Sequence, residues 1–470
     1  MTSWIPDLSS GSGPLYVRLA DRIEHDIDAG RLSAGTRLPP QRNLAFDIGV
    51  TIGTVSRAYA LARERGLVSG EVGRGTYILA ERQADAQASP PHLRVSSGHA
   101  PEPREGVLRF DTTAAPEIGI GPIVERLTVE ICREHPQEVA TYIRSLPTHW
   151  LEAGQRWLAR NGWEPEPHDV VPTLGVHAAI MSVIAAVTAT GDRILFEPLT
   201  YASVARSTAL FGRRPTAVAA DSEGPLPEDL ERVCAQQHPK LLFIMPAPQN
   251  PTLAMMGRQR RHDIAEVARR HQLFIIEDSI YGVMVEDDLP TIASMVPELV
   301  FHVGGLSKAV SAGLRGGWVA CPPGYASRIN TAHKMLTGGK PFLTAETVAR
   351  LVNSGAAFEL MQRTRADVAA RVSLARKTFE GCDVQLHDAV PFLWLNLPEP
   401  WLSGTFKAAA AAENIAIDEE DEFKPARSDI AFHGVRLGIT TEPSRELVGA
   451  GFRTLRQLLD QGPAAYDSYN

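Results

Sequence analysis

Apolar residues in the first eighty positions recur with the spacing of short amphipathic helices. Over residues 14–30 a leucine or isoleucine appears at every fourth position, and Gly30 stands where a helix C-cap is expected. A later helix carries Val55 and Tyr59 on one face. The expected elements are helices over 14–30, 41–47 and 51–65, followed by short strands over 67–69 and 76–79. Helices in this order before a hairpin predict a winged helix-turn-helix over residues 1–80.

A different pattern begins near residue 107, where short apolar runs alternate with helix-like segments. The apolar runs cover 193–196, 241–245, 273–277 and 299–303, and helix-like segments cover 225–238 and 257–271. This alternation predicts an α/β domain whose mostly parallel sheet is covered on both faces. We expect a large subdomain over about 120–330 and a small α+β subdomain over 331–470. Residues 81–106 contain Ala, Gln, Ser and Pro without an apolar period, which is typical of a linker.

Composition narrows the class of protein. The 470-residue chain is 44% hydrophobic and 22% charged, as in an ordinary soluble protein with a large core. We find no apolar run of about 18 residues that predicts a membrane span, and the N-terminus lacks the pattern of a signal peptide. Four cysteines without a CxxC pair are expected to be reduced, in a cytoplasmic protein without a metal site.

Any DNA binding must come from a local patch, because the net charge of the whole chain is −8. Between residues 37 and 76 there are six arginines and three acidic residues, a local balance of +3. Arginine can contact phosphate and can also bind guanine through two hydrogen bonds. The residues expected to contact an operator in double-stranded DNA are Arg37, Gln41, Arg42, Thr51, Thr54, Arg57, Arg74, Gly75 and Thr76.

The most informative candidate for chemistry is Lys308, one of seven lysines in the chain. A lysine that forms a Schiff base with an aldehyde must lie in a pocket, near groups that bind the rest of the cofactor. Ser307 precedes it, and Arg315 follows one short loop later, which suits a cofactor with a phosphate at one end. A Ser-Lys pair alone is more typical of a protein surface, so the interpretation depends on other residues.

Four further residues stand at or just beyond the ends of expected strands, where an open parallel sheet binds its ligands. Asp278 follows an apolar run, and a carboxylate there can keep a pyridine nitrogen protonated. Tyr281 and Asn250 can each donate a hydrogen bond to a phenolic oxygen, and Tyr201 offers a flat face for a ring. Taken singly, Asp278 also fits a helix N-cap, Asn250 a turn and Tyr201 a core position. Their joint occurrence favours a cofactor site.

With these motifs in place, the chain resembles a known family. Residues 107–462 resemble the fold-type I pyridoxal-phosphate aminotransferases, and residues 14–80 resemble the GntR-type winged helix. Together they resemble the MocR subfamily of GntR transcriptional regulators. In the first part, 38–45 (LPPQRNLA) is similar to the family's L-P-S-x-R-x-L-A, 54–59 (TVSRAY) to T-V-x-x-A-Y, and 73–77 (GRGTY) to G-x-G-T-Y/F.

The resemblance implies a role for each candidate of the second domain. Lys308 would form the internal aldimine with pyridoxal 5'-phosphate, and Asp278 would pair with the ring nitrogen. Arg436, within 435–439 (VRLGI), would hold the α-carboxylate of an amino acid. The residues implied to bind the cofactor are Gly175, Val176, His177, Tyr201, Asn250, Asp278, Tyr281, Ser307, Lys308 and Arg315.

Two segments depart from the family pattern. The phosphate loop, usually T-x-G-A/S-Q, is 173–177 (TLGVH), so the side chain of Val176 cannot donate a hydrogen bond and His177 replaces glutamine. Backbone amides at a helix N-terminus remain, so we expect phosphate binding that is weaker or differently arranged. The family's Y-x-x-P-x-G is 142–148 (YIRSLPT) without its glycine, which leaves substrate identity and catalytic competence open.

Three functions remain open at this stage. The first is a regulator that responds to the cofactor, or to an amine or amino acid that reacts with it, by shifting between two conformations. The second is a working aminotransferase with an accessory DNA-binding head, and the third is a decarboxylase or lyase. We expect a homodimer through 107–462, because the sites of fold-type I proteins resemble clefts shared between subunits. A linker of about 25 residues would let each head reach the partner in a head-to-tail arrangement.

Overall fold

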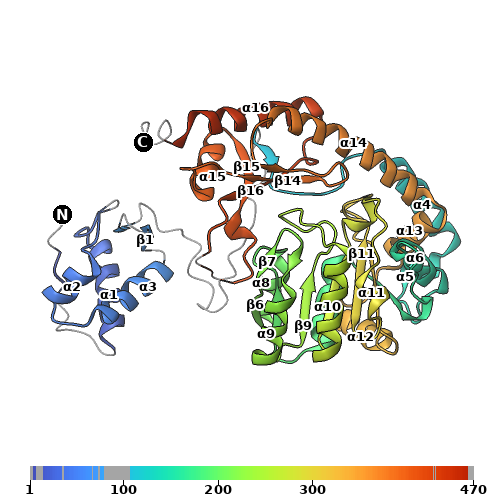
Figure 1. Cartoon of the computed structure of the whole chain (residues 1–470), viewed down its shortest axis with the longest axis horizontal. Helices are drawn as coiled ribbons and strands as arrows, with labels where there is room; N and C mark the ends of the chain where they lie inside the picture. The colour runs from blue at the N-terminus through green and yellow to red at the C-terminus, as the bar shows by residue number, and fades with distance from the viewer. Residues whose placement is uncertain are drawn as a thin grey trace. The chain divides into compact units, whose positions relative to one another are not determined.

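The computed structural model describes residues 4–6, 14–33, 36–65, 67–71, 75–78, 106–426, 428 and 430–463. The chain divides into two compact units, residues 1–97 and 98–470 (Figure 1). Residues 81–105 of the expected linker lie outside the described residues. No helix in the described part is long and apolar enough to cross a membrane, and none of its His, Cys, Asp and Glu residues form a group that could hold a metal. The four cysteines are free.

The first unit has the predicted three helices and hairpin. Its elements are α1 (Leu15–Asp28), α2 (Gln41–Asp47), α3 (Ile52–Glu64), β1 (Val68–Glu71) and β2 (Gly75–Ile78). Leu19 and Ile23 of α1 are fully buried, but Leu15, predicted on the same face, is 43% exposed because the first turn extends beyond the core cluster. Gly30 has the positive φ of +70° expected of a residue that ends a helix. The Tyr59 hydroxyl donates to the Pro39 carbonyl at 2.8 Å, which ties α3 to the segment before α2.

The wing of this unit contains a strand-like segment that the apolar pattern did not predict. The Leu38 amide donates to the Thr76 carbonyl at 2.8 Å, and the Ile78 amide donates to the Thr36 carbonyl at 2.9 Å. Residues 36–38 therefore pair with β2 beside the β1–β2 hairpin. Such pairing depends on a contact across about forty residues, which hydrophobic periodicity does not encode.

The second unit is built around a seven-stranded sheet in the order β4-β12-β11-β10-β9-β5-β6 (Figure 1). The strands are β4 (Val170–Thr173), β5 (Arg193–Phe196), β6 (Arg214–Ala217), β9 (Leu241–Ile244), β10 (Phe274–Asp278), β11 (Val300–Gly305) and β12 (Gly317–Ala320). The sheet is parallel except for β12, which is antiparallel to both of its neighbours. The predicted apolar runs therefore become strands within one or two residues of their expected ends.

Both faces of this sheet are buried, as the continuous apolar runs predicted. Successive residues of β10 point to opposite faces: Ile275 packs in one hydrophobic cluster and Ile276 in another. The helices of this part are α4 (Gly121–Glu134), α5 (Pro136–Ala140), α6 (Thr148–Leu158), α7 (Val176–Val187), α8 (Ala202–Leu210), α9 (Pro227–Gln237), α10 (Arg258–His271), α11 (Ile292–Met295), α12 (Ala326–Thr337) and α13 (Phe342–Asn353). A small hairpin, β7 (Ala220–Asp221) with β8 (Gly224–Pro225), adjoins β6 in the chain.

The C-terminal part has a second sheet in the order β13-β14-β16-β15-β3. Its elements are β3 (Leu108–Phe110), α14 (Ala356–Thr378), β13 (Val384–Gln385), β14 (Phe392–Asn396), α15 (Ser403–Ala412), β15 (Ile415–Glu419), the 3-10 turn η5 (Glu420–Glu422), β16 (Gly434–Gly438) and α16 (Arg445–Gln461). β3 joins it in parallel with β15, about three hundred residues later in the chain. In this sheet Arg436 lies directly opposite Asp418 on one side and Trp394 on the other. This register brings the segment after β3 beside Arg436.

Candidate cofactor site

The residues assigned to the cofactor and to a substrate carboxylate line one cavity of about 270 Å³. It lies beyond the carboxyl ends of β9, β10 and β11, as expected for a sheet of this kind. The residues that the structure brings together here are Gly175, Val176, His177, Tyr201, Asn250, Asp278, Tyr281, Ser307, Lys308, Arg315 and Arg436. Three neighbours that the sequence did not indicate, Asp111, Thr112 and Thr113, complete one wall.

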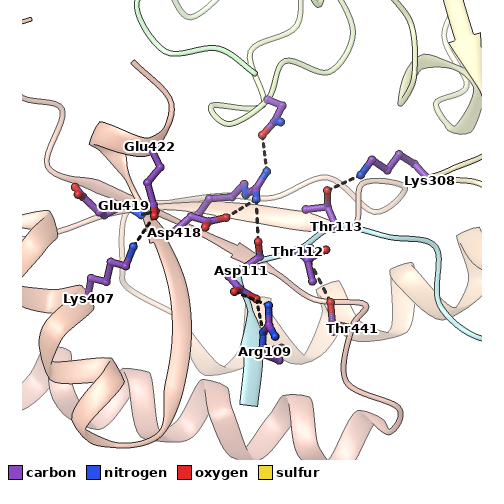
Figure 2. Close-up of polar contacts among 12 residues, drawn as sticks. Arg109, Asp111, Thr112, Thr113, Lys308, Lys407, Asp418, Glu419, Glu422 and Thr441 are labelled. Atoms are coloured by element: carbon purple, nitrogen blue, oxygen red, sulfur yellow. Dashed lines mark hydrogen bonds and ion pairs between the residues drawn. The ribbon is translucent and has the colours of Figure 1, made fainter. Parts of the chain in front are cut away.

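Lys308 follows the end of β11 and reaches across the cavity. Its Nζ donates to Thr113 Oγ1 at 3.0 Å (Figure 2), and Thr113 Oγ1 lies 3.1 Å from the Tyr281 hydroxyl. Burial lowers the pKa of Lys308 to about 8, and the positive charge of Arg436 acts in the same direction. A larger fraction of this amine is therefore neutral near pH 7 than for an exposed lysine.

Asp278 is the last residue of β10 and is only 2% exposed. Its Oδ1 accepts a hydrogen bond from the Ile280 amide at 3.0 Å. Burial raises the pKa of Asp278 to about 7, although that hydrogen bond and Lys308 act against it. The alternative role as a helix N-cap does not hold, because the next helical turn, Gly282–Met284, has Tyr281 at its N-cap position.

The loop before α7 makes close backbone contacts that require glycine. Gly175 precedes α7 with φ at +80°. A Cβ on Gly317 would lie 2.9 Å from the Gly175 carbonyl carbon, and a Cβ on Gly305 would lie 2.6 Å from the Gly316 carbonyl oxygen. The start of α7 thus packs on the backbone of β12, and its Val176 side chain lies against Gly305 of β11. The first amides of α7 form a cradle of the kind that binds phosphate.

The two departures in this loop have separate structural consequences. The side chain of Val176 is 8% exposed and belongs to the hydrophobic core, which leaves its backbone amide as the group that can face the cavity. His177 Nε2 lies 3.4 Å from Ser207 Oγ, and its ring stands edge-on to Tyr201 at 6.1 Å. Its Nδ1 is buried without a hydrogen-bond partner. Burial, aided by Arg315, lowers the pKa of His177, so the ring is neutral.

These contacts fit pyridoxal 5'-phosphate. The cavity offers a lysine amine, a buried carboxyl group, an aromatic face at Tyr201, and a backbone cradle beside Arg315. The buried Nδ1 of His177 in its wall is a polar atom that a bound ligand can satisfy, because buried polar atoms are rarely left without partners. Tyr201 is half-buried and lines the cavity, so it is more than a core residue.

Arg436 stands at the opposite wall and has several partners. Its Nη1 donates to Asn250 Oδ1 at 2.9 Å, and its Nη2 forms a short ion pair with Asp418. Nη2 also lies 3.5 Å from the Asp111 carbonyl oxygen (Figure 2). Asn250 is 4% exposed in the loop after β9, and its amide oxygen serves Arg436. Its amide nitrogen is the group that can still donate to a ring oxygen.

The DNA-contact candidates lie in the helices of the first unit, in the segments before them and in its wing. Arg37, Arg42, Thr51 and Arg57 are exposed, and Gln41, Thr54 and Thr76 are half-buried. Thr51 begins the turn into α3, where its Oγ1 accepts from the Thr54 amide at 3.2 Å and lies 2.9 Å from Thr54 Oγ1. Gly75 begins β2, and Arg74 lies outside the described residues.

Sequence reasoning missed Asp111, Thr113 and Asp418 for one reason. Each is brought to the cavity wall or to Arg436 by pairing in the second sheet, in which β3 and β16 lie on either side of β15. The one local signal was the polar triplet at 111–113, directly after the short segment 108–110 (LRF). That signal did not indicate a partner.

Comparison with known proteins agrees with this architecture. Residues 140–418 match the model of the aminotransferase class I and II family, and residues 15–78 match that of the gntR family of bacterial regulatory proteins. An uncharacterized HTH-type transcriptional regulator of Bacillus subtilis, YdeF, is 27% identical over 97% of both chains. The probable rhizopine catabolism regulatory protein MocR of Rhizobium meliloti is 25% identical over 68% of this chain and 69% of its own. A solved structure of LysN, the α-aminoadipate aminotransferase of Thermus thermophilus, superposes with a TM-score of 0.68 at 23% identity, covering 77% of this chain and 94% of its own.

Proposed function

Since the chain belongs to the aminotransferase class I and II family and carries a gntR-family domain ahead of it, we propose a function that joins the two. The order of these domains is the MocR-type architecture of transcriptional regulators. The proposed function is regulation of transcription by a protein that holds pyridoxal 5'-phosphate at Lys308 and responds to the cofactor, or to an amine or amino acid that reacts with it. One observation carries the proposal: the cavity that joins Lys308, Asp278 and the cradle at Gly175.

The residues of the cavity can divide the chemistry among them. Pyridoxal 5'-phosphate, when bound, supplies an electron-accepting ring. Lys308 offers an amine that is partly neutral at physiological pH, and a neutral amine is the form that attacks an aldehyde. Thr113 holds the Lys308 amine through the 3.0 Å hydrogen bond. Asp278 can hold a proton at a ring nitrogen, because a buried carboxylate favours a positive charge beside it.

The other end of the cavity suits an anion. The first amides of α7 carry the partial positive charge of a helix N-terminus, and the guanidinium of Arg315 and the hydroxyl of Ser307 line the same cavity. His177 is neutral and adds no charge of its own. We infer that phosphate binding here depends on backbone amides and Arg315. His177 offers a ring nitrogen at the position where the family has the side-chain amide of a glutamine.

We also propose that the protein is a homodimer through its second unit. Apolar side chains on α4, on α5 and just after α5 are exposed: Val129 by 43%, Val139 by 39% and Tyr142 by 92%. Exposed apolar groups of this size mark interaction surfaces when they gather on neighbouring elements. A symmetric dimer would present two DNA-binding heads to paired half-sites. We propose that each head reaches the partner subunit, so that chemistry at Lys308 changes the separation of the two heads.

The proposed function is tested by measuring the two activities on the same preparation. Operator sequences are first selected from random duplexes with the full-length protein, and cofactor loading is followed by visible absorption. We expect loading that depends on Lys308, and an operator affinity that changes when an amine is added to the loaded protein. Lys308→Ala is expected to keep DNA binding and lose the response. Loading without sequence-selective DNA binding would refute regulation.

A working aminotransferase with a DNA-binding head is the second candidate. Arg436 beside the cavity favours it, because a guanidinium can bind an amino acid's carboxylate. The discriminating measurement is the amount of pyridoxamine phosphate and keto acid formed when amino acids are added to the loaded protein. Accumulation over many turnovers supports the enzyme, whereas a single stoichiometric conversion or none supports the regulator.

A further inference from the structure

Arg436 is already engaged by a carboxylate of its own chain. Asp418 lies directly opposite it across the β15–β16 pair, and its Oδ2 forms a short ion pair with Arg436 Nη2 (Figure 2). The two side chains are only 16% and 10% exposed. The guanidinium that could bind a ligand carboxylate is thus already paired with a carboxylate of the same chain.

The partners of Arg436 leave no complete edge for a second carboxylate. A guanidinium binds a carboxylate through two parallel N–H groups, either Nε with Nη2 or Nη1 with Nη2. Nη2 belongs to both edges, and here it donates to Asp418 and lies 3.5 Å from the Asp111 carbonyl. Nη1 donates to Asn250, and Nε is buried without a partner. Both N–H groups of Nη2 thus have an acceptor, so a ligand carboxylate that takes two hydrogen bonds must compete with Asp418 or with the Asp111 carbonyl.

Arg436 itself is poorly placed to move away from Asp418. Its guanidinium lies over the rings of Phe423 and Phe392, with centroids 4.8 and 5.7 Å away, and Asn250 fixes its Nη1 at 2.9 Å. Stacking on aromatic faces and a buried hydrogen bond both restrain an arginine. The simplest way for a ligand carboxylate to bind is therefore that Arg436 keeps its position and Asp418 gives up its ion pair with it.

We propose that Asp418 competes with ligand carboxylates for Arg436, and that a carboxylate binds there when Asp418 releases the guanidinium as the neutral acid. Asp418 is then a specificity-determining residue. It disfavours amino acids relative to the corresponding amines without a carboxylate, and it couples carboxylate binding to proton uptake. This inference rests on the proposed function, because it assumes that the cavity around Lys308 is a ligand site.

The charged groups around Asp418 set the pH at which this exchange is possible. The positive charge of Arg436, on β16, favours the ionised form of Asp418. The negative charges of Glu422, in η5, and of Asp111, just after β3, disfavour that form. Burial is the largest influence, and the pKa of Asp418 is raised to about 6. The pKa is raised because the cost of removing the Asp418 carboxylate from water exceeds the attraction of the single cation beside it.

Two further cations stand near this cluster, and each already pairs with an acid. Lys407 of α15 donates to Glu422 Oε1 at 2.6 Å. Arg109 of β3 holds both oxygens of Asp111, at 2.8 and 2.9 Å (Figure 2). Arg109 also favours a negative charge on Asp418 at longer range, as the mutual electrostatic effect on its own pKa shows. These pairs leave Arg436 as the direct partner of Asp418.

The test uses cofactor-loaded, full-length protein and two carboxylates without an amine, propionate and 3-phenylpropionate, both ionised throughout pH 6–8. Binding is measured by calorimetry in two buffers that differ in ionisation enthalpy, which counts protons. If only the neutral form of Asp418 admits the ligand, the competent fraction falls from about one half at pH 6 to about one hundredth at pH 8. The dissociation constant should then rise about 50-fold, with close to one proton taken up at pH 7.

Asp418→Asn separates this effect from other titrations in the cavity. The amide keeps the shape and an acceptor oxygen but carries no charge, so carboxylate affinity should vary less than about threefold over the same pH range. Proton uptake should vanish, and binding at pH 8 should be tighter than in the wild type. Equal proton uptake in both proteins, or weaker binding by Asp418→Asn at pH 8, overturns the proposal.

A second measurement keeps the inference testable if Asp418→Asn does not fold. In the wild type, 3-phenylpropanamide, which has the shape of the carboxylate without its charge, should bind with no pH dependence between pH 6 and 8. An amide that follows the same pH dependence as the carboxylate overturns the proposal, as does a failure of both carboxylates to bind at pH 6. Loss of visible cofactor loading, checked before each titration, instead marks failure of the proposed function.

Discussion

The pH at which Lys308 loses its proton provides a direct test of cofactor attachment. Burial, with help from Arg436, lowers its pKa to about 8, whereas an ordinary lysine titrates near 10.4. The neutral amine is the form that attacks an aldehyde. At pH 7 about 9% of Lys308 is neutral, against about 0.04% of an ordinary lysine, so capture of the cofactor should be roughly 200-fold faster.

The assay mixes apoprotein with pyridoxal 5'-phosphate between pH 6 and 10 and follows visible absorption. Below pH 8 the rate should rise about tenfold per pH unit, and above pH 8 it should level off, because the amine is then already neutral. Lys340 is a matched control: it is a half-buried lysine whose pKa is also lowered to about 8, and its Nζ donates to Asn330 at 2.8 Å. Lys340→Ala should keep the rate profile, and Lys308→Ala should lose attachment that borohydride makes permanent.

Two results would refute this reasoning. One is a capture rate that keeps rising to pH 10, since the amine would then have the pKa of an exposed lysine. The other is attachment that survives in Lys308→Ala and disappears in Lys340→Ala. Arg436→Gln adds a check on the cause: removing a positive charge that favours the neutral amine should move the levelling-off to higher pH.

Three further outcomes are expected. Asp278→Asn should slow any reaction with amino acids by orders of magnitude while apoprotein binds DNA as before, and unchanged reaction kinetics would remove Asp278 from its role. Arg57→Ala should cost about 1–3 kcal/mol on a selected operator and relax specificity at one position, measured by titration of single-base variants; an equal loss on all sequences would point to phosphate instead. Sedimentation should show a dimer at micromolar concentration, and a monomer that still recognises its operator would exclude the dimer.

The elements that the sequence predicted well are those whose periodicity is local. The first unit, the strand that ends at Asp278 and the strand before Lys308 were expected from apolar runs, and the structure places them within a few residues of those expectations. Asn250, Asp278 and Lys308 became candidates because strand ends in a parallel sheet converge on one edge, whereas Gly175, Val176 and His177 were implied by the family resemblance. Asn250, Asp278 and Lys308 lie at or just beyond the ends of three neighbouring strands, so the short segments around them sufficed to bring them into one cavity.

What the sequence could not predict depends on pairing between distant strands. Thr113 holds the Lys308 amine because β3, near the start of the second unit, pairs with β15. Asp418 meets Arg436 because of the register between β15 and β16. A shift of one residue in that register would turn Asp418 to the other face of the sheet, and hydrophobic alternation alone does not fix it at this accuracy. The ion pair between Arg436 and Asp418 therefore could not be predicted from the sequence.

Gly438 shows how closely that second sheet is fitted to the cavity, and it carries the last prediction. A Cβ on Gly438 would lie 1.9 Å from the Thr112 carbonyl oxygen, a backbone atom that cannot rotate away. Gly438→Ala must push aside the segment that holds Thr113 against Lys308, at a cost of about 3 kcal/mol in stability. Gly404→Ala is the control, since a Cβ at this position in the first turn of α15 meets no atom within 4 Å and alanine there should not lower stability. Chemical denaturation and cofactor loading measured on both variants decide the matter: a Gly438→Ala protein as stable as the wild type, with unchanged loading, would show that this segment does not position Lys308.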